Sequence, residues 1–126
     1  MILIFGGAYQ GKLTWAVDRY ALAREDIWDL AGGLPEQPVA CYTHLEALTW
    51  QAVQAGETAG QLLARVTPLF SGSIVISREI GSGVVPMDKD QRQWRELHGQ
   101  VLQALARQAG TVIQIFCGIP EVWKCS

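Results

Sequence analysis

The fold is decided by one stretch near the start of the chain, Ile2-Leu3-Ile4-Phe5-Gly6-Gly7-Ala8-Tyr9-Gln10-Gly11-Lys12. Its first four residues form an unbroken apolar run, which is typical of a strand buried on both faces of a parallel sheet. The residues that follow match the phosphate-binding pattern GxxxxGK. From Lys12 onward, apolar side chains recur three and four residues apart, which predicts a helix lying on that sheet. The stretch therefore predicts a phosphate-binding loop (P-loop) between a strand and a helix.

Backbone N–H groups in such a loop, and at the start of the helix after it, point inward and bind phosphate oxygens. Lys12 neutralises the β and γ phosphates, which makes it a candidate catalytic residue. The alternative is an ordinary tight turn that carries a solvated lysine. The predicted nucleotide-binding residues are Gly6, Gly7, Ala8, Gln10, Gly11, Lys12, Leu13 and Thr14.

Leu13 departs from the motif, which has Ser or Thr at this position. That hydroxyl ligates the Mg²⁺ that bridges the β and γ phosphates, and a leucine side chain has no oxygen to offer. Thr14 is the next residue, about 100° further round the helix, so it replaces the ligand only if the turn shifts register. The sequence therefore assigns no residue to Mg²⁺.

The rest of the chain alternates strand and helix patterns. Strands are expected at residues 26–30, 39–42, 73–77 and 111–116, and helices at residues 43–56, 58–69 and 88–109. Thr43 with Glu46, and Asp88 with Gln91, are spaced as capping boxes. Residues after 118 are expected to form a short tail. This alternation predicts an α/β fold, a P-loop NTPase-like three-layer sandwich with a mostly parallel sheet of four or five strands.

Composition limits the classes of function. The 126 residues suit a single nucleotide-binding domain spanning 1–126, and a net charge of −2 without a basic cluster argues against a nucleic-acid partner. Cys41, Cys117 and Cys125 form no CxxC pair, which favours a reducing compartment and inert thiols for the first two. The apolar start is too short for a signal peptide or a membrane span, so a cytoplasmic location is expected. Five tryptophans in a small domain favour a homo-oligomer.

Three further segments carry a family resemblance. They are Ile74 to Pro86 with its Arg-Glu-Ile-Gly-Ser-Gly-Val-Val-Pro run, the helical run Trp94-Arg95-Glu96-Leu97-His98-Gly99, and Gly118-Ile119-Pro120. Together with GGAYQGK, this half of the chain, Ile74 to Lys124, resembles the adenosylcobinamide kinase / adenosylcobinamide-phosphate guanylyltransferase family of cobalamin biosynthesis. The chain looks like a shortened and divergent member.

The resemblance implies an enzyme that uses ATP or GTP to phosphorylate the corrinoid substrate adenosylcobinamide and then transfers GMP to the new phosphate. It implies phosphate-binding roles for Gly6, Gly11 and Lys12, and places Glu79 and residues 81–86 near the active site. Glu79 also follows a predicted parallel strand, at the edge where α/β sheets bind ligands. It is therefore the second candidate catalytic residue, although a solvated turn carboxylate is the simpler alternative.

The middle of the chain departs from the family. Matching residues 39–43 to the family's Asp-Cys-Leu-Thr strand leaves Ala40 where the magnesium-side carboxylate belongs, and Asp29 is the other candidate. The segment with the family's guanylylated histidine is missing. His44 and His98 lie outside that motif, and both are interpreted as structural.

Two hypotheses of different classes follow. The first is a cobinamide kinase-like phosphotransferase that lacks the guanylyltransferase step. The second is a catalytically degenerate nucleotide-binding or regulatory module that has lost its metal ligands, as Leu13 and Ala40 suggest. A P-loop kinase acting on another small molecule is a third and weaker alternative.

Overall fold

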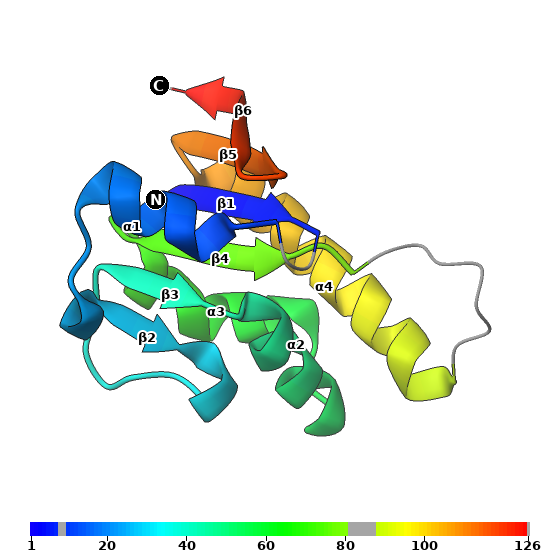
Figure 1. Cartoon of the computed structure of the whole chain (residues 1–126). Helices are drawn as coiled ribbons and strands as arrows, with labels where there is room; N and C mark the ends of the chain where they lie inside the picture. The colour runs from blue at the N-terminus through cyan, green and yellow to red at the C-terminus, as the bar shows by residue number, and fades with distance from the viewer. Residues whose placement is uncertain (8–9, 81–87, 126) are drawn as a thin grey trace.

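The computed structural model describes residues 1–7, 10–80 and 88–125. Within these ranges, strands and helices build a three-layer α/β sandwich around a mostly parallel sheet, which confirms the predicted fold class (Figure 1). Two short 3₁₀ helices, at Arg24–Asp26 and Leu30–Gly32, flank the second strand. The strands and helices are β1 (Ile2–Gly6), α1 (Lys12–Tyr20), β2 (Ile27–Asp29), β3 (Cys41–Thr43), α2 (Leu45–Gln54), α3 (Ala59–Phe70), β4 (Ile74–Arg78), α4 (Lys89–Gln108), β5 (Thr111–Phe116) and β6 (Ile119–Cys125).

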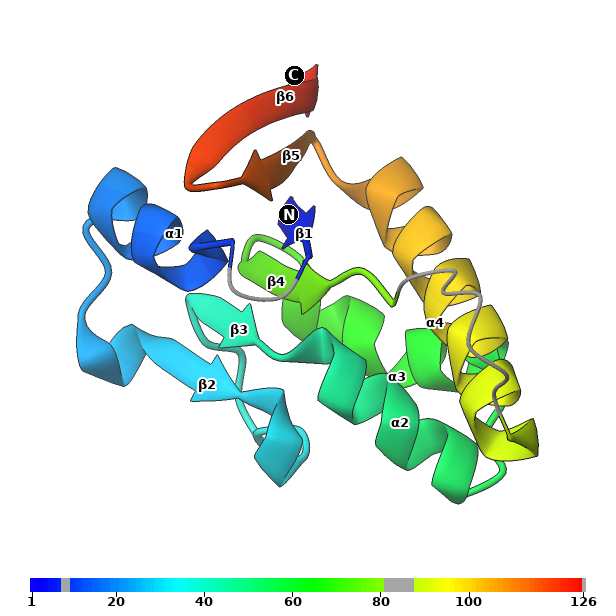
Figure 2. The same cartoon turned by 45° about the vertical axis from the view of Figure 1, so that its right-hand side comes forward.

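The strand order places the glycine loop in the middle of the sheet. The order is β2-β3-β4-β1-β5-β6, and all neighbouring pairs are parallel except β5 with β6 (Figure 2). Strand β1 lies between β4 and β5, with Ile4 opposite both Ile76 and Ile113. The loop after β1 therefore opens at the carboxyl ends of the parallel strands, where open α/β sheets form their ligand-binding crevices.

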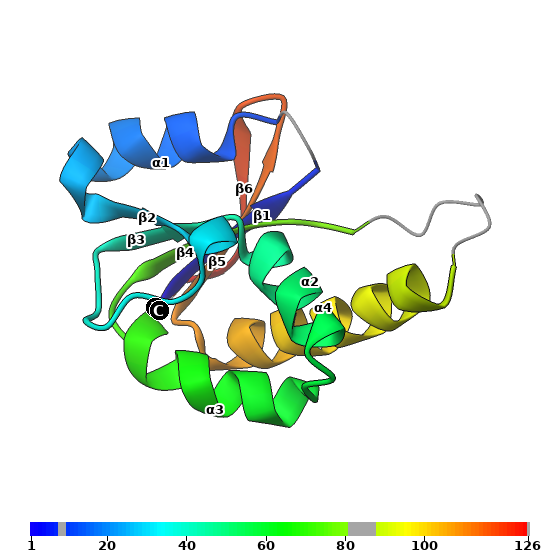
Figure 3. The ribbon, with the colours of Figure 1, turned by 90° about the horizontal axis from the view of Figure 1, so that it is seen from below.

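Helices cover both faces of the sheet. Helix α1 lies on one face, and α2, α3 and α4 lie on the other (Figure 3). Neighbouring residues of β1 point to opposite layers, so that Ile4 packs with Ala16 of α1 while Leu3 packs with Val101 and Leu105 of α4. Because both faces of β1 are covered, side chains on both sides of the strand must be apolar, which explains the unbroken apolar run.

The end of the chain differs from the sequence-based expectation. Residues 119–125, expected to be a tail, form β6, so the described sheet has six strands rather than four or five. Every residue of β6 is exposed, so the strand has no buried apolar face whose periodicity could have predicted it. Of the described residues, the large apolar side chains that are exposed all lie on the β5–β6 hairpin: Phe116, Ile119, Val122 and Trp123.

The turn of this hairpin corrects a second expectation. Cys117 is exposed and sits between β5 and β6 with a positive φ of 51°, so it is not the buried strand residue that the apolar run predicted. Cys41 is buried in β3, as expected. The run Thr111–Phe116 ends one residue before Cys117 because the chain turns there to form the hairpin.

Candidate nucleotide-binding site

The glycine loop begins at a glycine that no other residue can replace without a shift of the sheet. The Gly6 carbonyl accepts a hydrogen bond from the Glu79 N–H at 2.9 Å, which continues the pairing of β1 with β4. On the opposite side, a Cβ atom added at Gly6 would clash with the carbonyl oxygen of Ile115 in β5. The close approach of β5 therefore explains the first glycine of the motif. Ala8, a predicted nucleotide-binding residue, lies outside the described residues, as does Tyr9.

The second half of the loop is tied to the turn between β5 and β6. The backbone carbonyl of Gln10 accepts a hydrogen bond from the Gly118 N–H at 2.9 Å, and its side-chain Oε1 accepts one from the Cys117 N–H at 2.6 Å. Gly11 has a φ of 82° and caps the start of α1, a backbone conformation that favours glycine. The hairpin thus holds the loop where it enters the helix.

Lys12 is half-buried, and its ammonium group turns back over the loop. Its Nζ donates a hydrogen bond to the Gly7 carbonyl at 2.7 Å. Burial lowers the pKa of Lys12, and the positive charge of Arg78 lowers it further. The negative charges of Glu46 and Glu79 raise it, but the net pKa is lowered. The lysine is therefore a poorly solvated cation among charged neighbours, which is a suitable setting for binding an anion.

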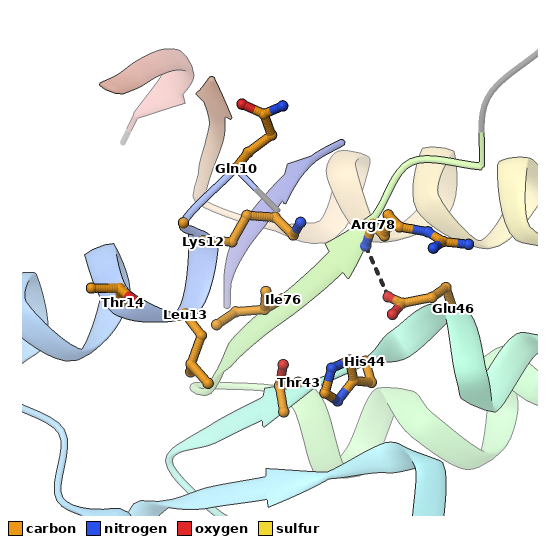
Figure 4. A pocket seen from close by; sticks show the side chains of 10 residues that line it. Gln10, Lys12, Leu13, Thr14, Thr43, His44, Glu46, Ile76 and Arg78 are labelled. Carbon is orange, nitrogen blue, oxygen red and sulfur yellow. Dashed lines mark hydrogen bonds between the residues drawn. The ribbon is translucent and has the colours of Figure 1, made fainter. Parts of the chain in front are cut away.

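A cavity of about 350 Å³ opens beside Lys12, at the carboxyl ends of β3 and β4 (Figure 4). This volume falls within the range of small-molecule sites. Two cations and one carboxylate contribute to its wall, so the described lining carries a net positive charge. The residues that line the cavity are Gln10, Gly11, Lys12, Leu13, Thr14, Thr43, His44, Glu46, Ile76 and Arg78. Five of the eight predicted nucleotide-binding residues are among them, whereas Gly6 and Gly7 are not.

Glu46 was not predicted as a site residue, because its spacing from Thr43 favoured a capping box. That capping box is wrong: the N-cap of α2 is His44, which has a φ of 64° and makes no side-chain capping bond. Glu46 instead accepts a hydrogen bond from the Arg78 N–H at 2.9 Å, with its carboxylate at the cavity. A carboxylate in the first helical turn after a buried strand was the signal that could have pointed to it.

Asp29 contacts His44 but does not line the cavity. Its Oδ1 lies 3.0 Å from His44 Nδ1 and 2.9 Å from the Ala31 N–H, which donates to it. Desolvation raises the pKa of Asp29, but the hydrogen bonds from Ala31 and His44 outweigh it, so the net pKa is lowered. The interpretation of His44 as merely structural is incomplete, because its half-exposed ring lines the cavity.

Ala40, the residue aligned with the family's magnesium-side carboxylate, lies away from the cavity. Ala40 precedes β3, and its carbonyl accepts a hydrogen bond from the Ile74 N–H at the amino end of β4. The glycine loop lies at the other end of the strands, where β3 ends with Thr43. Thr43, not Ala40, therefore occupies the position next to the cavity.

Leu13 and Thr14 both contact the cavity but point differently. In Figure 4, the Leu13 side chain extends toward Thr43, whereas Thr14 points away from it. The described residues include no group of three or more His, Cys, Asp or Glu side chains able to hold a metal ion. Oxygen ligands for a cation at this cavity would therefore have to come from fewer protein groups and from the ligand itself.

Glu79, the second predicted catalytic residue, follows β4 and is exposed. It lines another cavity, of about 440 Å³ and mainly apolar, between the sheet and α4, rather than the cavity beside Lys12. Its charge nevertheless acts on Lys12. Residues 81–86 of the resemblance motif lie outside the described residues.

His98 of α4 holds the end of β4, which forms part of the cavity wall. It is buried, and its Nε2 lies 3.0 Å from the Arg78 carbonyl and 3.1 Å from Ser77 Oγ, while its Nδ1 lies 2.8 Å from Thr49 Oγ1. Because a carbonyl can only accept, Nε2 carries the proton and Nδ1 accepts from Thr49. His98 is therefore a structural histidine, as predicted.

Comparison with known proteins agrees with this architecture. A family model described as cobinamide kinase / cobinamide phosphate guanyltransferase matches residues 39–122, which are 84 of the 126 residues. The match covers β3, Glu46, Arg78 and Glu79 and begins after the glycine loop. No curated protein matches the chain.

None of the helices described for residues 1–7, 10–80 and 88–125 has the length and apolar character needed to cross a membrane.

The matching family acts in cobalamin biosynthesis on cobinamide and nucleotide substrates. Because its model covers more than half of the sequence, the chain belongs to the cobinamide kinase / cobinamide phosphate guanyltransferase family.

Proposed function

We propose that the chain is one nucleotide-binding domain, spanning residues 1–126, that transfers the γ-phosphoryl group of ATP or GTP to adenosylcobinamide. The observation that carries this proposal is the position of Lys12 at the start of α1, facing a cavity of about 350 Å³ with Arg78 as a second cation. A nucleotide triphosphate is the family substrate whose charge matches such a lining.

In this reaction the loop amides and the start of α1 bind the β and γ phosphates. The aminopropanol hydroxyl oxygen of cobinamide forms a bond to the γ phosphorus, and the bond from that phosphorus to the nucleoside diphosphate breaks. Lys12 and Arg78 stabilise the charge that moves to the leaving oxygen. Glu79 lines the neighbouring apolar cavity, and its charge acts on Lys12; we propose it as the carboxylate that accepts the proton of a hydroxyl brought to the end of β4.

We propose further that the guanylyltransferase step is absent. A covalent GMP intermediate needs a histidine nitrogen that can reach the α phosphorus. His98 is buried with both ring nitrogens engaged, and His44 lacks the family's surrounding motif. With GTP and cobinamide phosphate as substrates, we expect no diphosphate release.

The kinase proposal is tested by incubating the chain with cobinamide, Mg²⁺ and either ATP or GTP, and by detecting cobinamide phosphate by mass spectrometry. Lys12→Ala should abolish the product. Lys89→Ala, at an exposed position at the start of α4, is the matched control and should retain the wild-type rate. Failure of the wild type to form product with either nucleotide would contradict the proposal.

The second candidate function is a nucleotide-binding or regulatory module without turnover. Leu13 favours it, because the residue that normally contributes a metal-binding hydroxyl is apolar here. This alternative predicts nucleotide binding by calorimetry that Mg²⁺ does not alter. If Mg²⁺ strengthens nucleotide binding and cobinamide phosphate is formed, the result contradicts this alternative and supports the kinase.

A further inference from the structure

Because residue 13 is a leucine, it has no hydroxyl with which to bind the Mg²⁺ that accompanies a nucleotide. Mg²⁺ takes oxygen ligands, and in nucleotide sites one or two come from the protein while phosphates and water supply the rest. Two protein oxygens at the cavity are therefore sufficient, and the wall of this cavity contains such a pair.

The first oxygen belongs to Thr43, the last residue of β3. Thr43 is 6% exposed, and its hydroxyl points into the cavity, on the side where Leu13 approaches (Figure 4). The hydroxyl makes no hydrogen bond to another described residue, although the side chain is nearly buried. A buried strand thus presents a hydroxyl at the place that the Leu13 side chain faces.

The second group is the carboxylate of Glu46. Its Oε1 accepts the Arg78 N–H at 2.9 Å, and this bond directs the carboxylate toward the cavity, leaving Oε2 without a partner among the described residues (Figure 4). Glu46 is the sole carboxylate among the described residues of the lining. Because the first turn of α2 and the end of β4 both hold it, this acceptor is oriented before any ligand binds.

We infer that Thr43 and Glu46 together hold the Mg²⁺ of the bound nucleotide and take over the position that Leu13 cannot serve. The inference rests on the proposed nucleotide binding. When bound, the ion neutralises charge on the β and γ phosphates. The protein ligands would then come from β3 and α2 on the far side of the cavity rather than from α1.

A merely structural Glu46 would act differently. As an ion partner of Lys12, it would compete with the phosphates for that cation whether or not metal is present. As a metal ligand, it favours binding only when Mg²⁺ is present and, by like-charge repulsion, opposes binding when Mg²⁺ is absent. Both roles predict equal or tighter metal-free binding in Glu46→Gln, but only the loss of a metal ligand also reduces the Mg²⁺ effect, so the size of the Mg²⁺ effect separates the two roles.

Calorimetric titration of ATP and GTP, in EDTA and again with Mg²⁺, provides the test. For the wild type we expect Mg²⁺ to tighten binding at least about fivefold, the lower end of ordinary coupling between two ligands. Glu46→Gln preserves an acceptor for the Arg78 N–H but removes the charge. It should reduce the Mg²⁺ effect to less than about twofold while leaving metal-free binding equal or tighter.

Thr43→Val preserves shape and removes the hydroxyl, so it should also lose most of the Mg²⁺ effect, whereas Thr43→Ser should retain it. Glu36→Gln removes a carboxylate from an exposed loop and is the control for charge alone. Leu13→Ser added to Glu46→Gln restores the motif's hydroxyl and should recover part of the Mg²⁺ effect. Circular dichroism melting checks that each variant is folded.

Equal wild-type affinities in EDTA and in Mg²⁺ would overturn the inference and leave nucleotide binding intact. Full retention of the Mg²⁺ effect in both Glu46→Gln and Thr43→Val would overturn it as well. A complete lack of nucleotide binding would remove the proposed function, and the inference with it.

Discussion

The carboxylate of Glu46 accepts a hydrogen bond from the backbone N–H of Arg78 at 2.9 Å, although 32 residues separate the two in sequence. The carbonyl of the same Arg78 lies 3.0 Å from Nε2 of buried His98. The backbone of Arg78, at the end of β4, is therefore held by α2 through its N–H and by α4 through its carbonyl. This arrangement gives the cavity beside Lys12 a wall whose polar groups are already positioned.

The close approach of β5 to Gly6 predicts a large effect of a single methyl group. Gly6→Ala places a Cβ against the Ile115 carbonyl, so β1 and β5 must move apart. We expect the free energy of unfolding to fall by about 1–3 kcal/mol, the usual cost of overpacking, as measured by urea denaturation. Gly99→Ala, a helical position with open space around it, should instead be stabilising. A neutral Gly6→Ala would contradict the tight strand contact.

The bond between Gln10 and the β5–β6 turn predicts a role in nucleotide affinity. Gln10→Ala removes the acceptor of the Cys117 N–H and leaves the loop attached through its backbone alone. Since a single hydrogen bond contributes about 1 kcal/mol, we expect nucleotide binding to weaken about fivefold in calorimetry. Cys117→Ala preserves the N–H and should bind like the wild type. Equal affinity of Gln10→Ala and the wild type would show that the bond does not position the loop.

His98 predicts a loss of stability on acidification. Burial lowers the pKa of His98 below its ordinary 6.5; the hydrogen bond to the Arg78 carbonyl and the charge of Glu46 oppose this shift, and Arg78 adds to it. Below pH 6.5 the unfolded chain thus binds a proton that the folded chain resists. This contribution to stability is complete above pH 6.5 and is lost as the pH falls through the folded pKa.

Urea denaturation at several pH values between 7.5 and 5 measures this effect. One such group gives a slope of at most about 1.4 kcal/mol per pH unit. His98→Gln removes the titrating ring, so its free energy of unfolding should depend less steeply on pH than that of the wild type. The same slope in both proteins would mean that His98 is not the group responsible.

The three thiols should differ in reactivity. Burial, with a smaller contribution from the charge of Asp26, raises the pKa of Cys41 to about 11, whereas Cys117 and Cys125 are exposed. Iodoacetamide at pH 8 should therefore modify two thiols in the native protein and the third only after unfolding, as counted by mass spectrometry. Rapid modification of Cys41 in the native state would contradict the buried position of β3.

Where short-range patterns carried the information, the sequence was sufficient to predict the elements. The apolar run of β1 and the start of α1 at Lys12 were predicted and are confirmed, whereas the phosphate-binding role of the GxxxxGK loop between them stays a prediction. The capping box of Asp88 and Gln91 is likewise present at the start of α4. These features depend on residues within a few positions of one another, so they can be recognised without knowing the rest of the fold.

Features that depend on pairing between distant segments were missed. Strand β6 has no buried side and exists because β5 offers an open edge for it to pair with. Thr43 and Glu46 were assigned to a local capping box, yet of these two side chains only Glu46 makes a hydrogen bond within the described part of the chain, and its partner is Arg78 of β4. No local spacing distinguishes a capping glutamate from one that turns toward a neighbouring strand.

By itself, the sequence determined the order of most elements, the GxxxxGK motif and the family resemblance, because each is encoded in local periodicity or in a contiguous motif. Only the tertiary structure decided which side chains share the cavity with Lys12. Parallel pairing of β3, β4 and β1 brings the ends of strands that are far apart in sequence to one edge of the sheet. There the positions of Thr43, Glu46 and Arg78 depend on register and helix entry, which no local pattern encodes.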